Sequence, residues 1–363
     1  MLIARFIARS CAVLTVGFSL IAALAPNPAW AAKDLEGVTL RVACWGGSWL
    51  KRIQSTIEPQ LVARGAKVEY VVGNPHDNLA KLVAARGQAV PFDIIEFSEN
   101  NRTDMNEAGV LAELDYSQVS NAAPIDPRYR LKNMVAHSST IDGIVYNADK
   151  FKELGVPAPK TYADLANPKL KGRVTFGEPT VIQGVKGIVA IAYENGGNEK
   201  NLKPGLEAIN KLAPGSFYKS STKLFAQFKA GDIWAAHWHV GWVIRGRKAD
   251  IPLAFAMPKI QDKHAVISNV WLGVVKGTSN AKAAQAFINE YLASKPQEEI
   301  GRLTGARPVN QAAADALKSD PLLAEFLPLT SKDYAEVYYS DLTSIDMAAL
   351  VDQWNRTVSQ KAK

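Results

Sequence analysis

The sequence is poor in cysteine: Cys11 and Cys44 are the only two thiols in 363 residues. Cys11 lies in an N-terminal segment that we expect to be removed, so the mature chain keeps Cys44 alone and can form no internal disulfide. Disulfides are common in exported proteins, which meet an oxidising compartment. Without one, this chain has to draw its stability from a hydrophobic core.

Long apolar runs are also missing beyond the N-terminus. The first run, Ser10 to Ala25, follows Arg5 and Arg9 and precedes Ala29-Trp30-Ala31, which has the small-x-small pattern of a cleavage site. It is shorter than the stretch of about 20 residues that a membrane span needs, so we interpret residues 1–31 as an export signal. The best later candidate, Val185 to Tyr193, is shorter still. We therefore expect an exported protein that is not inserted in the membrane.

No block of lysine or arginine interrupts the chain. The formal net charge of +7 falls to +5 (7 − 2) when Arg5 and Arg9 leave with the signal. A charge so diluted gives no reason to expect a nucleic-acid partner. With 47% hydrophobic residues and roughly 330 mature residues, two domains are the natural expectation.

Short apolar runs alternate with longer amphipathic ones, which is typical of an α/β fold with a largely parallel sheet. In the first part of the mature chain, expected strands alternate with expected helices. The ranges, beginning with a strand, are Val38–Ala43, Trp49–Arg64, Lys67–Val72, Asp77–Arg86, Phe92–Phe97 and Arg102–Gly109. Further strands are expected at 143–147, 174–176, 233–237, around Phe255 and at 270–275. Helices are expected after Thr180, at 281–304 and from Ile345 onward. In such sheets ligands bind beyond the carboxyl ends of the strands.

Three loops follow strands of this kind: Trp45-Gly46-Gly47-Ser48, Gly73-Asn74-Pro75-His76 and Ser98-Glu99-Asn100-Asn101. Glycines allow a tight turn and a close approach of backbone N–H groups, and Ser48 is a suitable N-cap for a helix that begins at Trp49. Cys44 points away from Trp45 in a strand and is expected to be a buried thiol.

The order of these pieces resembles the periplasmic substrate-binding proteins of bacterial ABC importers, especially the branch of the spermidine/putrescine binders. The matching pieces are Trp45–Trp49, Phe92–Ile95, Gly109–Asp115, Gly143–Asn147, Ala163–Leu165 with Pro168–Gly172, Gly231–Trp238, Met257–Lys259, and Lys276–Ser279 with Gln297. Each piece is weak alone, but together they cover nearly the whole mature chain in the order of the family.

The resemblance implies an α/β, two-lobed periplasmic-binding-protein fold of type II-like architecture, with the ligand cleft between the lobes. Lobe one would comprise residues 33–142 and 270–315, and lobe two residues 143–269 and 316–363. The protein would be a monomer that needs no cofactor, binds a small ligand and hands it to a membrane permease.

The resemblance also places candidate ligand residues at the cleft. They are Trp45, Ser48, Glu99, Asn100, Glu178, Thr180, Trp238, Asn269, Trp271 and Arg307. Tryptophan rings attract ammonium groups and cover methylene groups, although ordinary core packing is an equally good explanation for any single one. Trp234 is expected in the core, and Trp49 and Trp242 remain open between core and cleft.

Several positions depart from the polyamine-binding pattern. Asn100 replaces an aromatic residue, Val181 and Asn269 stand at or near acid positions, and Ala306-Arg307 replaces another aromatic residue. Arg307 could instead hold a carboxylate through two parallel hydrogen bonds, while Glu99 or Glu178 receives an amine. An amino acid or other aminocarboxylate therefore suits the sequence better than putrescine does, and a solvent-facing Arg307 is the alternative.

Two other functions have some support in single residues of the sequence. An exported metal-dependent hydrolase could use His237, His239 and Asp232, but no neighbouring ligand completes a metal site and no Gly-x-Ser-x-Gly motif is present. We expect no catalytic and no metal-binding residue. A receptor for ferric ion or an anion could use Tyr338-Tyr339, which we expect to pack within a C-terminal helical region instead.

Overall fold

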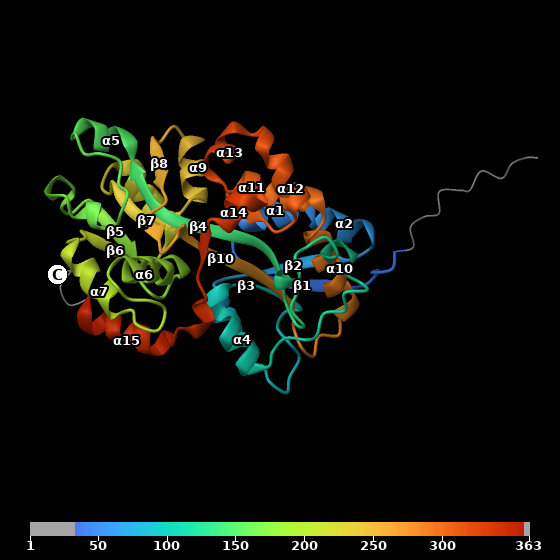
Figure 1. Ribbon diagram of the computed structural model, residues 1–363. Helices are drawn as coiled ribbons and strands as arrows, with labels where there is room; N and C mark the ends of the chain where they lie inside the picture. The colour runs from blue at the N-terminus through green and yellow to red at the C-terminus, as the bar shows by residue number, and fades with distance from the viewer. Residues whose placement is uncertain (1–32, 359–363) are drawn as a thin grey trace, which may run out of the picture.

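The computed structural model describes residues 33–358 as an α/β protein of two lobes joined by long strands. In Figure 1, β1 to β3 lie in one lobe and β5 to β7 in the other, and β4 and β10 run between them. The predicted export signal at 1–31 lies outside the described residues. Among residues 33–358, no helix has the length and apolar character of a bilayer span.

One mixed sheet runs through the molecule in the order β2-β1-β3-β10-β4-β7-β5-β6. The strands on this path are β1 Thr39–Cys44, β2 Lys67–Val72, β3 Ile94–Ser98, β4 Val135–Asn147, β5 Val174–Gly177, β6 Ser216–Tyr218, β7 Ala235–His239 and β10 Lys263–Val274. The shorter strands β8 Leu253–Ala256, β9 Lys259–Ile260, β11 Arg307–Pro308 and β12 Val337–Tyr339 pair with β4 or β10.

Helices surround this sheet in both lobes. They are α1 Ser48–Thr56, α2 Glu58–Ala63, α3 Pro75–Ala84, α4 Arg102–Ala108, α5 Ala148–Glu153, α6 Ile182–Glu194, α7 Lys203–Lys211, α8 Ser221–Ala230, α9 Gly241–Arg247, α10 Ala281–Tyr291, α11 Ser294–Thr304, α12 Gln311–Ala316, α13 Pro321–Phe326, α14 Ser331–Ala335 and α15 Met347–Thr357.

Along the main path of the sheet, the parallel pairing that the sequence predicts is found only at the two ends, and the short strand β12 adds a parallel pair on β10. Strand β1 is parallel to β2 and β3, and β5 is parallel to β6 and β7. In the centre, β10 is antiparallel to β3 and β4, and β4 is antiparallel to β7. The chain passes between the lobes along β4 and returns along β10, so the two connecting strands necessarily run in opposite directions.

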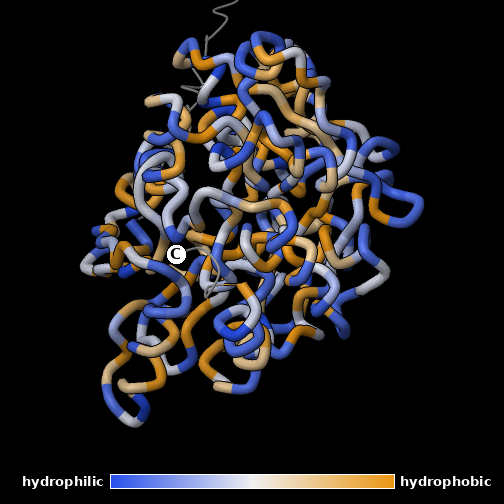
Figure 2. Tube along the Cα trace, turned by 90° about the vertical axis from the view of Figure 1, so that its left-hand side faces the viewer, coloured by the Kyte–Doolittle hydropathy of each residue, from blue (hydrophilic) through white to orange (hydrophobic). Residues whose placement is uncertain are grey.

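The apolar residues divide into separate clusters. One is built from residues 35–136 and 271–309, and two others from the second lobe and the C-terminal segment. Figure 2 shows hydrophobic segments gathered inside and hydrophilic ones along the outer loops. The cores therefore follow the lobes, and the connecting strands carry the polar residues between them.

Some expected elements differ in detail. The helix expected over 49–64 breaks at Ile57, where Pro59 in the first turn of α2 lacks an N–H to continue the earlier helix. The helix expected over 281–304 breaks because Ala293 is extended. The N-cap of α1 is Gly47, with φ of 64°, and not Ser48, which lies inside the helix. Tyr338-Tyr339 belongs to strand β12 and not to a helix.

Candidate functional site

The carboxyl ends of strands from both lobes meet along the middle of β4 and β10. Ser98, the last residue of β3, pairs with Val270, and His239, the last residue of β7, pairs with Asp142. Between them Thr140 of β4 pairs with Ser268 of β10. We call this region the lobe junction, and it is the place where an α/β sheet of this kind presents its loops to a ligand.

Trp45 and Trp49 form an aromatic pair at the end of β1. Their ring centroids are 5.6 Å apart, both side chains are half-buried, and Trp49 also meets His137 of β4 edge-on at 6.0 Å. The Gly46-Gly47 turn brings the two rings together, and Trp49 lies against β4. Ser48, which lies between them in the sequence, is half-buried, and its side chain makes no capping hydrogen bond to the helix.

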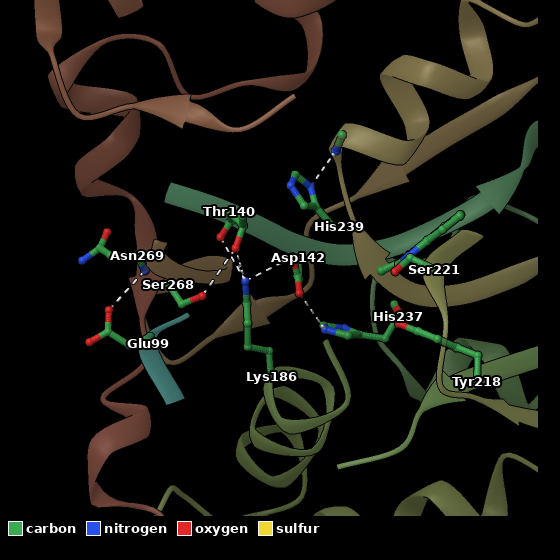
Figure 3. A network of polar contacts seen from close by, with 12 residues as sticks. Glu99, Thr140, Asp142, Lys186, Tyr218, Ser221, His237, His239, Ser268 and Asn269 are labelled. Carbon is green, nitrogen blue, oxygen red and sulfur yellow. Dashed lines mark hydrogen bonds and ion pairs between the residues drawn. The ribbon is translucent and has the colours of Figure 1, made fainter. Parts of the chain in front are cut away.

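Glu99, Asn269 and Trp271, three of the predicted ligand residues, are brought together. The Oε2 atom of Glu99 accepts hydrogen bonds from the Trp271 indole N–H at 2.9 Å and from the Asn269 backbone N–H at 3.2 Å. Figure 3 shows Glu99 beneath Asn269. The other carboxylate oxygen pairs with Arg102, whose guanidinium lies 4.7 Å from the Trp271 ring. The buried Glu99 carboxylate is therefore already compensated.

Asn100, the next residue of that loop, is half-buried. Its side-chain oxygen is shielded from solvent and accepts no hydrogen bond from the residues that the structure describes. Its role in ligand binding stays a prediction.

Arg307 is buried and fully engaged within the protein. Its guanidinium donates to the carbonyls of Pro328 and Pro308 at 2.9 and 2.8 Å and to Gln311 at 2.5 Å. It also lies 4.2 Å over the Tyr334 ring. The solvent-facing alternative is therefore wrong. A carboxylate would have to compete with these bonds, so ligand binding by Arg307 stays a prediction.

The second-lobe candidates, Glu178, Thr180 and Trp238, differ in their partners and in their exposure. Glu178, at the end of β5, pairs with Lys219 at 3.3 Å, and Thr180 is exposed. Trp238 is buried and stacks on Phe228 and Trp242 at centroid distances of 5.6 and 4.8 Å. Its indole N–H donates to Ser221, so it sits in a packed aromatic cluster and its contact with a ligand stays a prediction. Trp242 belongs to the same cluster.

A buried polar network at the lobe junction was missed by the sequence analysis. Lys186 of α6 donates to the backbone oxygen of Thr140 at 2.9 Å and lies 3.1 Å from Asp142. His237 lies 3.8 Å from Asp142 (Figure 3), and its ring also bonds the Tyr162 hydroxyl. Burial lowers the pKa of Lys186 and raises that of Asp142, and the attraction within the pair opposes both shifts. The available signal was a lone lysine within an apolar helix.

A second buried cluster lies under Trp49. Glu96 of β3 accepts a hydrogen bond from the Tyr291 hydroxyl, and His137 and Arg52 lie 3.2 and 3.9 Å from its carboxylate. Burial favours the neutral acid, but His137 and Arg52 outweigh it and lower the pKa of Glu96. This cluster fixes α1 and α10 against β3 and β4 and supports the tryptophan pair above it.

The groups behind the rival functions have partners of their own. Among residues 33–358, no three His, Cys, Asp or Glu side chains gather in a way that could hold a metal ion. The Tyr338 hydroxyl bonds Tyr193 and Glu199 at 2.8 Å each. Tyr338 and Glu199 line a surface pocket of about 570 Å³. Cys44 is buried, as predicted, and burial raises the pKa of its thiol.

Comparison with known proteins identifies a matching family. A family model described as bacterial extracellular solute-binding protein matches residues 62–325. Among similar solved structures is the periplasmic binding protein AgtB from A. tumefaciens R10 in complex with agropinic acid, with 21% identity, a TM-score of 0.68 and coverage of 89% of this chain and 97% of that one.

Two further structures are comparable. One, named as a GABA receptor, has 20% identity, a TM-score of 0.71 and coverage of 90% and 98%. Another, described as a spermidine/putrescine ABC transporter from Listeria monocytogenes, has 18% identity, a TM-score of 0.70 and coverage of 89% and 99%. At these identities the likeness shows the fold, which is the two-lobed fold of substrate-binding proteins.

Proposed function

The chain belongs to the bacterial extracellular solute-binding proteins, and from that premise we propose that it is a periplasmic receptor for a small polar organic solute, an aminocarboxylate or a polyamine. It is a solute-binding receptor that delivers its ligand to the permease of an ABC transporter, and it is not an enzyme. The export signal at 1–31 and the periplasmic location are part of the proposal.

The observation that carries the proposal is the lobe junction. Strand ends from two lobes face each other across β4 and β10, so a ligand held there contacts both lobes at once. Contacts from both lobes favour the closed arrangement over the open one, which gives the permease a shape to recognise. The proposed lobes are residues 33–142 with 270–315, and 143–269 with 316–363. The separate apolar clusters support this division, apart from Ile141 and Ala314, which pack with the second lobe.

Between the two ligand classes, the charges favour the aminocarboxylate. Glu99, the acid that a polyamine would need in lobe one, is already bound by Arg102, Trp271 and a backbone N–H. The half-buried Trp45 and Trp49 offer rings to an amine or to its methylene chain. Solved proteins of the same fold are in complex with agropinic acid or named for GABA, which is compatible with this preference.

A thermal-shift panel with aminocarboxylates, polyamines and unrelated sugars tests the proposal. A true ligand at about 100 times its Kd stabilises the folded protein by about 2.7 kcal/mol and so raises the Tm. We expect 4-aminobutyrate or a longer homologue to raise it more than putrescine does. Stabilisation by sugars alone, with no effect of either amine class, would contradict the proposed ligand.

A further inference from the structure

His239 occupies a special place at the lobe junction. It is the last residue of β7 and is 4% exposed. The following Gly241 begins α9 and lies directly against the end of α11 in the other lobe, because an added Cβ on Gly241 would stand 2.1 Å from the Thr304 carbonyl oxygen. Arg245 of α9 donates to the same carbonyl at 2.9 Å. His239 is therefore covered where the two lobes touch.

The protonation of the His239 ring is defined by one hydrogen bond. The backbone N–H of Gly241 donates to Nδ1 at 2.7 Å (Figure 3), so Nδ1 carries a lone pair. A neutral imidazole with an acceptor at Nδ1 carries its proton on Nε2. Burial, Arg245 and Lys186 all lower the pKa of His239, so the ring is neutral. Nε2–H is then a donor.

This donor has no partner within the protein. Nε2 is shielded from solvent and forms no hydrogen bond with the residues that the structure describes. An unpaired buried N–H is unfavourable unless another molecule supplies the acceptor. The Nε atom of the neighbouring Arg245, which is largely buried and lies 4.1 Å over the Trp242 ring, is likewise without an acceptor.

The charges near His239 select the type of acceptor. Arg245 and Lys186 are the cations that act on its ring; Lys186 and Asp142 form an ion pair at 3.1 Å with no net charge, so Arg245 supplies the net positive charge near His239. A negatively charged oxygen is attracted to this positive charge, whereas an ammonium group is repelled by it.

We propose that His239 is a ligand-binding residue whose Nε2–H donates to a carboxylate of the solute, and that this contact from the second lobe selects carboxylates over amines at the junction. The inference rests on the proposed receptor function and adds the residue and the chemical group that it recognises. Parting of the lobes at the Gly241–Thr304 contact would expose the ring to an entering ligand, and closure would bury the new bond.

Calorimetry with 4-aminobutyrate, its amide 4-aminobutanamide and putrescine tests the inference. Wild type should bind the carboxylate best. His239→Phe keeps a ring and removes the donor, and should weaken 4-aminobutyrate binding about 10- to 100-fold, as expected for a lost hydrogen bond to a charged group. His239→Gln retains an N–H donor and should recover most of the affinity. His264→Phe, at an exposed histidine of β10, is the matched control and should bind like wild type.

The outcomes separate the inference from the function on which it rests. If His239→Phe binds 4-aminobutyrate as tightly as wild type, the role of His239 is wrong and the receptor function stands. If wild type binds putrescine alone, the receptor function also stands and carboxylate selection is wrong. If wild type binds none of the three probes, the proposed ligand class fails and this inference fails with it. Melting of the ligand-free variants shows whether a loss of affinity reflects unfolding.

Discussion

The Arg307 guanidinium binds two backbone carbonyls and the Gln311 side chain while stacked on Tyr334. Arg307→Ala leaves these buried acceptors unpaired, so we expect a loss of about 2–4 kcal/mol in the free energy of unfolding. Urea denaturation measures it. Arg128→Ala is the control, because its exposed guanidinium also lies over a tyrosine ring and pairs with Asp126, and it should cost less than about 1 kcal/mol.

Ligand titration of the same variant decides what the arginine does. A wild-type affinity for 4-aminobutyrate, in a variant that is less stable, would make Arg307 a structural residue. An affinity lost without any loss of stability would support the sequence-based prediction that it binds the ligand.

The His237 ring gives the molecule a pH dependence of known sign. Burial, with a further contribution from Lys186, lowers its pKa to about 3, against about 6.5 in an unfolded chain. Between these two pH values His237 is protonated in the unfolded state and neutral in the folded state. The free energy of unfolding therefore decreases as pH falls below about 6.5, by at most about 1.4 kcal/mol per pH unit.

His237→Gln should reduce this slope, since glutamine does not titrate and can still bond the Tyr162 hydroxyl. Urea midpoints at pH 7, 6 and 5 provide the measurement, with His264→Gln as the exposed control. An unchanged slope in His237→Gln would show that the other buried histidines, His137 and His239, carry the whole effect.

At this scale sequence reasoning named some candidates that lie together and missed other buried polar residues beside them. The family resemblance placed Glu99, Asn269 and Trp271 at the cleft, and the structure shows that they contact one another. Trp238 faces the aromatic cluster while its neighbours His237 and His239 have polar partners. Alternation along a strand predicts such a division, but it does not say which face meets the core, and the apolar residue was preferred.

Helix α6 is joined to strand β4 by a buried ion pair between Lys186 and Asp142. Lys186→Met removes the cation and leaves an acid with a raised pKa in an apolar site, so we expect a loss of about 3–5 kcal/mol. Adding Asp142→Asn to Lys186→Met should recover at least part of it. Equilibrium unfolding of both variants checks the pair, and a double variant no more stable than the single one would contradict the coupling.

Strand β4, one of the two connecting strands, was only half predicted from the sequence. Its second half, 143–147, was recognised, whereas the first half carries His137, Ser138, Ser139 and Thr140, all buried. A strand that crosses between lobes has no single apolar face, so the period-two pattern of apolar residues is absent there. For the same reason, the sequence pattern does not reveal that the strands in the centre of the sheet are antiparallel.

The two lobes touch at Gly241 and Thr304, where backbone meets backbone. Gly241→Ala places a methyl group within this contact and should hold the lobes apart. We expect a larger radius of gyration by X-ray scattering in the presence of ligand, and an affinity reduced about 10-fold or more because closure is opposed. Gly246→Ala is the matched control, since the three atoms nearest to its added Cβ all belong to the Leu253 side chain within the second lobe.

A Gly241→Ala protein that closes and binds like wild type would show that this contact does not limit closure. If Gly246→Ala opens the molecule equally, strain within α9 and not the lobe contact is responsible. At this scale the two-lobed fold followed from the order of motifs along the sequence, whereas the contact that joins the lobes involves two residues that no local pattern relates.

Cys44 ends β1 with 1% of its surface exposed, and it is the one cysteine of residues 33–358. Burial raises the pKa of its thiol, which keeps it in the protonated, unreactive form. Within residues 33–358, a cysteine introduced at an exposed position such as Thr180 would thus be the single site that a maleimide dye modifies in the folded protein. The receptor could then carry one environment-sensitive fluorophore without prior removal of its native thiol, and would report its own ligand as a reagentless optical sensor.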